Sequence, residues 1–91
     1  MTTTQAPGLL DTERALIKES VCDILELEPA DVTGASLFKE LGADSLGVIE
    51  ILAHIEQEFA VTIDQSQLDR MVSLDGVYAV VAEARAAAGQ K

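Results

Sequence analysis

The fifteen residues from Ser45 to Phe59 constrain the fold more than any other part of the sequence. Asp44 stands directly before them, where a side-chain oxygen can cap the free N–H groups of a helix. Large apolar residues recur at spacings of three and four, which place them on one helical face. They are Val48, Ile51, Leu52, Ile55 and Phe59. The pattern predicts a central helix that turns this face toward the core.

A second apolar stripe follows the opposite side of the same predicted helix. A small bundle covers one side of each helix, so we expect this stripe to be exposed. From Glu40 to Asp69 the chain also holds seven acidic residues and no lysine or arginine. Together these features favour a docking surface for a partner with an apolar groove and a basic rim. The alternative is a solvated acidic face, on which single exposed apolar residues are ordinary. The stripe consists of Leu46, Ile49 and Ala53, flanked by Glu50 and Glu56.

The rest of the chain also shows helical spacing and no strand-like alternation. A first helix is predicted from Asp11 to Glu26, a short one over 65–70, and a last one from Leu74 to about Ala88, capped by Ser73. The first is expected to bury Leu10, Ile17, Val21 and Ile24, with Leu25 beside them, and the last to bury Leu74, Val77, Val81 and Ala84. The fold class is therefore all-α, a small three-to-four-helix bundle.

A long connection separates the first two predicted helices. Pro29, Gly34 and Gly42 interrupt the helical pattern. One helical turn is expected over 36–40, and the apolar anchors Leu37, Phe38 and Leu41 argue against disorder. A loop of this length in so small a domain is commonly functional.

Length and composition limit the remaining possibilities. At 91 residues the chain allows one domain, which we expect over 9–87, between a flexible leader (1–8) and a flexible tail (88–91). A net charge of −10 argues against nucleic acid and anionic membranes as partners. Cys22 is the single cysteine, so no disulfide framework or cysteine metal site is expected. With no signal segment and no apolar run longer than six residues, a cytoplasmic monomer is predicted.

The position of Ser45 allows two interpretations. As the first residue of the central helix it can be an ordinary capping residue together with Asp44. The same position offers free N–H groups and a positive helix end to a phosphate ester. A nucleophile acting alone is excluded, because the single histidine, His54, lies nine residues later and about 13 Å along the helix.

Other chemistry finds little support in the sequence. No EF-hand spacing and no histidine pair are present, so no metal site is predicted. Glu50, Glu56 and Glu58 have nothing around them that would tune their acidity for acid–base catalysis. The chain is therefore not expected to be an enzyme.

The sequence resembles the acyl carrier proteins over about Ile17 to Val81. The resemblance rests on Leu41-Gly-Ala-Asp-Ser-Leu46 after a long loop, followed by Glu50 and Ile55-Glu56-x-Glu58-Phe59. It implies that a phosphopantetheinyl transferase attaches 4'-phosphopantetheine to Ser45, whose terminal thiol then carries cargo as a thioester. It also implies that partner enzymes dock through the matching positions on the central helix, and that the core stripe could line a pocket for apolar cargo. The positions that match the docking residues of the family are Asp44, Leu46, Ile49, Glu50, Ala53 and Glu56.

Departures from the fatty-acid carriers bear on the pathway. Gly47 replaces a residue that is often acidic in them, and Asp64 stands where they commonly have proline. Asp44-Ser-Leu-Gly47 and Ser66-Gln-Leu-Asp-Arg70 are more similar to carriers of activated amino acids, such as the D-alanine carriers. The resemblance thus implies a discrete acyl or aminoacyl carrier of bacterial polyketide or nonribosomal peptide antibiotic biosynthesis.

Several alternatives stay open. A housekeeping fatty-acid carrier and a D-alanyl carrier belong to the same class. An unmodified acidic helical interaction module belongs to another. For a carrier, the expected partners are the transferase, an adenylating or acyl-transferring loading enzyme, and a downstream acyltransferase or synthase with a basic docking surface.

Overall fold

The computed structural model describes residues 9–89, and every regular element in that range is helical. Three α-helices form the body: α1 (Asp11–Leu25), α2 (Ser45–Phe59) and α3 (Leu74–Gly89). Three short 3-10 helices lie in the connections: η1 (Pro29–Asp31), η2 (Phe38–Leu41) and η3 (Gln65–Arg70). The predicted all-α bundle with a long first loop is confirmed.

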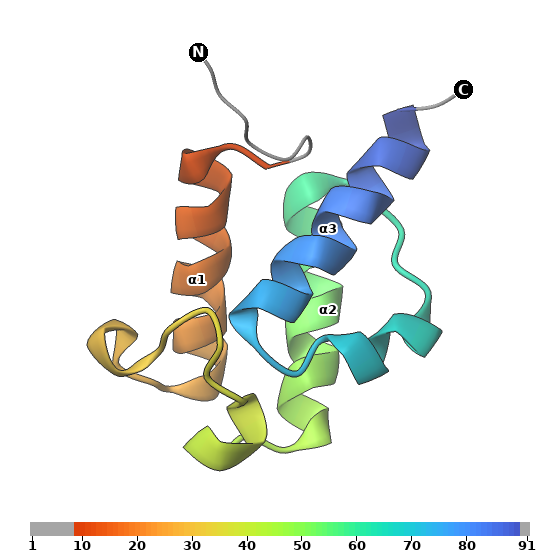
Figure 1. The fold of residues 1–91 in the computed structure, drawn as a ribbon. Coiled ribbons are helices and arrows are strands. Elements are labelled where there is room, and N and C mark those ends of the chain that lie inside the picture. Colours follow the sequence, from red (N-terminus) through yellow and green to blue (C-terminus); the bar gives the residue numbers. More distant parts are fainter. Residues whose placement is uncertain (1–8, 90–91) are drawn as a thin grey trace.

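The two ends of the helical bundle are formed by different elements (Figure 1). α1 packs against α2 and α3, while η3 lies against α2 and α3. α2 begins at one end of the bundle, next to η2, and we call this the Ser45 end. The start of α1 and the ends of α2 and α3 lie at the opposite end, which we call the far end (Figure 1).

The core follows the predicted apolar faces. Ile17 and Val21 of α1 are fully buried against Ile51 and Ile55 of α2 and Val77 of α3. Each such side chain contributes about 1.5–3 kcal/mol to folding through loss of contact with water. The connections close the core with further buried side chains, namely Val32, Phe38, Val61, Ile63 and Met71. Of the predicted α2 core face, Val48 and Phe59 are only half-buried.

Caps define the helix ends as expected. The Asp44 carboxylate accepts a hydrogen bond from the Gly47 N–H at 3.0 Å, and the Ser73 hydroxyl accepts one from the Gly76 N–H at 3.3 Å. α1 ends at Leu25, one residue before the prediction, because Glu26 adopts a left-handed conformation (φ 58°). Such a residue stops a helix by supplying its N–H to the last free carbonyls.

Three details differ from the sequence expectations. Leu10, placed in the core by its spacing, is 66% exposed, whereas Leu9 is buried. Leu10 is the N-cap of α1 and has extended backbone angles (φ −81°, ψ 162°), so it does not share the helical face. The turn predicted over 36–40 lies at Phe38–Leu41, because the Ser36 hydroxyl accepts a hydrogen bond from the Thr33 N–H. Pro29, expected only as an interruption, starts η1.

The predicted leader and tail lie largely outside the described residues. α3 continues to Gly89, so helix extends into the segment predicted as a tail, 88–91. The predicted leader, 1–8, and residues 90–91 lie outside the described residues.

Candidate functional site

Ser45 is the first residue of α2 and its side chain is exposed. The capping bond at this helix start comes from the neighbouring Asp44, whose carboxylate accepts from the Gly47 N–H. The side-chain cap at this helix start is thus supplied by Asp44 and not by Ser45. The exposed Ser45 is accessible from solvent.

A tight turn brings the chain to Ser45. Gly42 ends η2 with φ 96°, a left-handed conformation that glycine adopts without strain. The next residue, Ala43, donates its N–H to the Phe38 carbonyl at 3.0 Å. These contacts hold η2 directly before α2, so that Ser45 stands at the junction of a fixed turn and a long helix.

An open pocket of about 730 Å³ lies beside Ser45. Four segments form it: η2, the first turn of α2, η3, and the chain that follows η3. The lining is mostly apolar, with Lys39, Asp44, Ser45 and Asp69 as its polar members. Its apolar members are Leu37, Phe38, Ala43, Val48, Leu68, Met71 and Val72. Of the core stripe that the resemblance implied as the lining of a cargo pocket, Val48 alone lines this one. The sequence did not predict the other lining residues, because the two walls come from segments at least twenty residues apart in the chain.

The pocket has a fixed side and a more exposed rim. Phe38 and Met71 are fully buried. The Phe38 N–H donates to the Val72 carbonyl at 2.8 Å, which joins the η2 wall to the chain after η3. Leu37 and Val72, on either side of that bond, are 40% and 48% exposed. An apolar chain that begins at Ser45 would meet apolar side chains here.

The second stripe of α2 is exposed as predicted. Leu46 and Ile49 are among the few large apolar side chains on the surface, with exposures of 62% and 40%. Ala53 and Glu50 are also exposed. The geometry that a docking surface needs is thus present, while docking itself stays a prediction.

Two side chains of α2 have structural contacts that the helical pattern did not show. The Glu56 carboxylate accepts from the Ile63 N–H at 2.7 Å, so this half-buried residue fastens the loop after α2. His54 faces α1, where its Nε2 lies 3.1 Å from the Ser20 hydroxyl. The same nitrogen lies 3.2 Å from the Glu58 carboxylate. His54 is therefore engaged far along α2 from Ser45.

Cys22 is buried in the core, and desolvation by this burial raises the pKa of its thiol. A thiol that stays protonated is a poor nucleophile. Among residues 9–89, no group of three or more potential metal-ligating side chains comes together. None of the helices in this range is long and apolar enough to cross a membrane.

Comparison with known proteins matches this chain to a protein family and to similar proteins. The family described as "Phosphopantetheine attachment site" matches residues 15–81. The chain is 58% identical over 78 residues to "Polyketide-8 synthase acyl carrier protein 1" of Streptomyces avermitilis, covering 85% of this chain and 93% of that protein. It is 38% identical to "Polyketide-8 synthase acyl carrier protein 2" of the same organism, over 85% of this chain and 84% of that one.

A solved structure is similar in fold. In "The ishigamide ketosynthase/chain length factor", one chain superposes with a TM-score of 0.72 at 30% identity. The match covers 85% of this chain and 99% of that chain, so the two chains are of similar size.

Proposed function

Since the chain belongs to the acyl carrier protein family, whose cofactor is covalently attached 4'-phosphopantetheine, we propose that Ser45 is the attachment residue. The observation that carries this proposal is the position of the exposed Ser45, which stands beside the pocket while Asp44 supplies the side-chain cap of the helix. The first turn of a fifteen-residue helix offers free N–H groups and a positive dipole end to the phosphate. The residues present thus fit the cofactor.

The proposed role is to hold an acyl intermediate as a thioester on the arm and to present it to other enzymes. The arm supplies the thiol, and the chain supplies a fixed attachment point, an acidic surface and an apolar pocket. Modification, loading and transfer are assigned to partner enzymes, so this chain is a carrier without its own catalysis. The pocket is proposed to accept the first part of an apolar cargo.

We assign the carrier to polyketide biosynthesis. Support comes from the two polyketide carriers of Streptomyces avermitilis, above all from the 58% identity to the first. An acyl cargo is therefore favoured over the aminoacyl cargo that the Asp-Ser-Leu-Gly string resembles. Fatty-acid and D-alanyl carriage are the outcomes that would overturn this assignment in a loading assay with purified enzymes.

The proposed partners are a phosphopantetheinyl transferase, an acyl-transferring loading enzyme and a synthase with a basic docking surface. Leu46, Ile49 and Ala53 would bury apolar area in the partner, while Asp44 and Glu50 would meet its basic rim. Glu56 joins this surface only in part, because its carboxylate is already bonded to the Ile63 N–H.

An Ile49→Glu variant tests the docking surface. We expect the kcat/KM of loading by the cognate enzyme to fall at least about tenfold, because a central apolar anchor would become a desolvated charge. Leu16→Glu is the matched control, since Leu16 is 43% exposed on α1 and Ile49 is 40% exposed on α2. The control should load as the wild type does. Equal loading of both variants would contradict docking through the α2 stripe.

A further inference from the structure

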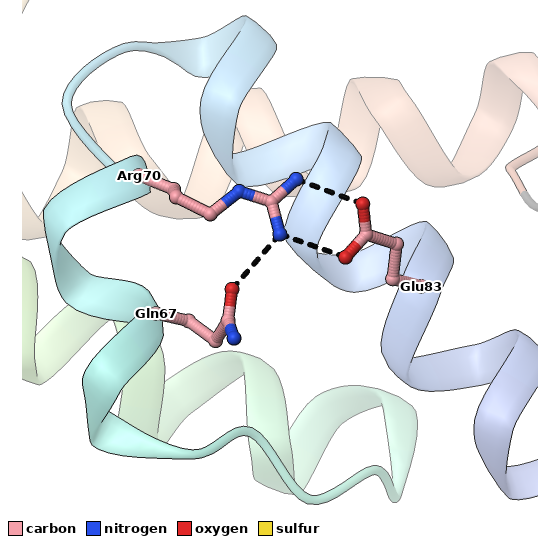
Figure 2. Close-up of polar contacts among 3 residues, drawn as sticks. All are labelled: Gln67, Arg70 and Glu83. Atoms are coloured by element: carbon pink, nitrogen blue, oxygen red, sulfur yellow. Dashed lines mark hydrogen bonds and ion pairs between the residues drawn. The ribbon is translucent and has the colours of Figure 1, made fainter.

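Arg70, the last residue of η3, joins this short helix to α3 through a forked ion pair (Figure 2). Its Nη1 lies 2.7 Å from Oε1 of Glu83, and its Nη2 lies 2.8 Å from Oε2 of the same carboxylate. Nη1 also donates to Oε1 of Gln67, one turn back in η3, at 2.9 Å. We call these three residues the Arg70 clasp. Both guanidinium nitrogens that face Glu83 are used, which fixes direction as well as distance.

The Arg70 clasp and the Ser45 pocket lie on different sides of η3. Leu68 and Asp69 line the pocket, whereas Gln67 and Glu83 line a smaller cavity of about 180 Å³ between η3 and α3. η3 is thus a thin wall with the pocket on one side and the clasp on the other. Any outward movement of η3 from α3 would move Leu68 and Asp69 relative to Ser45.

Apart from the Arg70 clasp, η3 is held by Leu68, which packs against the core, and by the Asp64 carboxylate, which caps its first turn at the Ser66 N–H. None of the six residues of η3 is fully buried, although Leu68 is half-buried. A 3-10 helix has weaker internal hydrogen bonds than an α-helix and is usually short. Its C-terminal end is fixed where the Arg70 carbonyl packs against Gly76, since a Cβ at position 76 would overlap that oxygen. The Arg70 clasp reaches the preceding turn of η3 through Gln67.

We infer that Arg70, paired with Glu83, is a positioning residue that sets the shape of the Ser45 pocket by holding η3 against α3. The biological meaning of this inference rests on the proposed carrier function, because a cargo on Ser45 is what would occupy the pocket. The clasp is solvent-exposed, with side-chain exposures of 44% for Arg70 and 61% for Glu83. Such a pair shifts a local equilibrium modestly and weakens as salt rises. The ion pair therefore favours the position of η3 against α3 but still allows η3 to move away and the pocket to widen.

Backbone hydrogen exchange of the unmodified full chain tests the hold on η3. The Met71 N–H, bonded to the Leu68 carbonyl, and the Phe38 N–H, bonded to the Val72 carbonyl, report on the pocket wall. In Arg70→Gln and Glu83→Gln we expect both amides to exchange about twofold to fivefold faster, the range of an exposed ion pair. The double variant should add nothing to Arg70→Gln, because the pair with Glu83 is already broken in that single variant.

Arg85→Gln is the matched control, because it removes the same charge and breaks the ion pair to Glu13 instead. It should leave exchange at Met71 and Phe38 unchanged relative to the amide of Ile55, a fully buried residue that reports on global unfolding. Unchanged exchange at both wall amides in Arg70→Gln, or an equal increase in Arg85→Gln, would overturn the inference.

A chemically attached chain provides a readout that a merely stabilising ion pair would not move. A Ser45→Cys variant, carrying a decyl group through a disulfide, places an apolar chain at the pocket without any transferase, and the buried Cys22 thiol is shielded from the reagent. We expect nuclear Overhauser contacts from the decyl group to Leu68 and Val48. Arg70→Gln should weaken the contacts to Leu68 and leave those to Val48. The exchanged pair, Arg70→Glu with Glu83→Arg, should restore them.

Contacts to Leu68 that stay the same in Arg70→Gln would overturn the assignment of Arg70 as a positioning residue. Failure of enzymatic modification at Ser45 would overturn the proposed function instead. The two failures are distinct, because the decyl chain is attached by thiol chemistry alone.

Discussion

The two phenylalanines of the chain mark the two ends of the bundle and have different surroundings. Phe38 lies at the Ser45 end, fully buried in η2 and against the pocket. Phe59 closes α2 at the far end, where it is half-buried and the Arg85 guanidinium carbon lies 5.8 Å from its ring centroid. The Phe38 ring thus lines the pocket beside Ser45, whereas the Phe59 ring is covered by the Arg85 guanidinium.

The contacts around each ring explain this difference. At the far end, Arg85 of α3 pairs with Glu13 of α1, and the other Glu13 oxygen accepts from the Leu10 N–H at 3.0 Å. Long helices are joined there by side chains. At the Ser45 end, short turns joined by backbone bonds take the place of a fourth long helix, and a pocket remains between them. A carrier needs both: a stable body and an end that a cargo and partner enzymes can reach.

Truncating each ring in turn is the strongest way to break this comparison. Phe38→Ala should lower the free energy of unfolding by about 3–5 kcal/mol, the usual cost of removing a buried aromatic ring. Phe59→Ala should cost clearly less, because that ring is already partly exposed. Urea unfolding followed by circular dichroism measures both. Equal losses would show that the two ends are held alike.

Acid should weaken the ion pair at the far end. The hydrogen bond from Arg85, followed by that from the Leu10 N–H, lowers the pKa of Glu13 below its ordinary value of 4.5. The unfolded chain therefore takes up this proton first as pH falls. The stabilisation is complete above about pH 4.5 and is lost as pH falls through the lower, folded pKa.

A Glu13→Gln variant should consequently show a flatter dependence of Tm on pH below about pH 4.5 than the wild type. Tm measured between pH 3 and pH 7 tests this. Glu50→Gln, which removes an exposed carboxylate on α2, is the control and should keep the wild-type slope. A wild-type slope in Glu13→Gln would mean that the ion pair does not fasten this end.

The smallest expected change in stability is that of Gly47→Ala, in the first turn of α2. Gly47→Ala gains up to about 1 kcal/mol of helix propensity. The new Cβ would press on the end of the flexible Leu25 side chain, which can turn aside. We expect a Tm higher by a few degrees or unchanged. Gly76→Ala is the contrasting variant and should lower Tm, because its Cβ meets the backbone of Arg70. A loss of stability in Gly47→Ala would show that Leu25 is fixed.

The sequence was sufficient where local rules decide the structure. The bounds of α2, the caps at Asp44 and Ser73 and the limits of η3 all follow from spacing and capping chemistry. The exposed stripe also follows, because helical geometry alone separates Leu46 and Ile49 from the core face.

Where residues distant in the chain meet, local rules were not enough. Leu10 shares the spacing of α1 but not its backbone angles, so the core takes Leu9 instead. The hydrogen bond that the Glu56 carboxylate accepts from the Ile63 N–H was not predicted, while its role in docking stays a prediction. The pairing of Arg70 with Glu83 and the pocket walls depend on how η2, η3 and α3 come together. No periodicity in the sequence specifies that arrangement.

The measurement that tests the central claim most directly is the intact mass of the protein after incubation with coenzyme A and a broad-specificity phosphopantetheinyl transferase. The wild type should gain the mass of one phosphopantetheine group, and Ser45→Ala should gain none while keeping the same helical circular dichroism. No mass gain on the folded wild type, or an equal gain on Ser45→Ala, would contradict the assignment of Ser45 as the attachment residue.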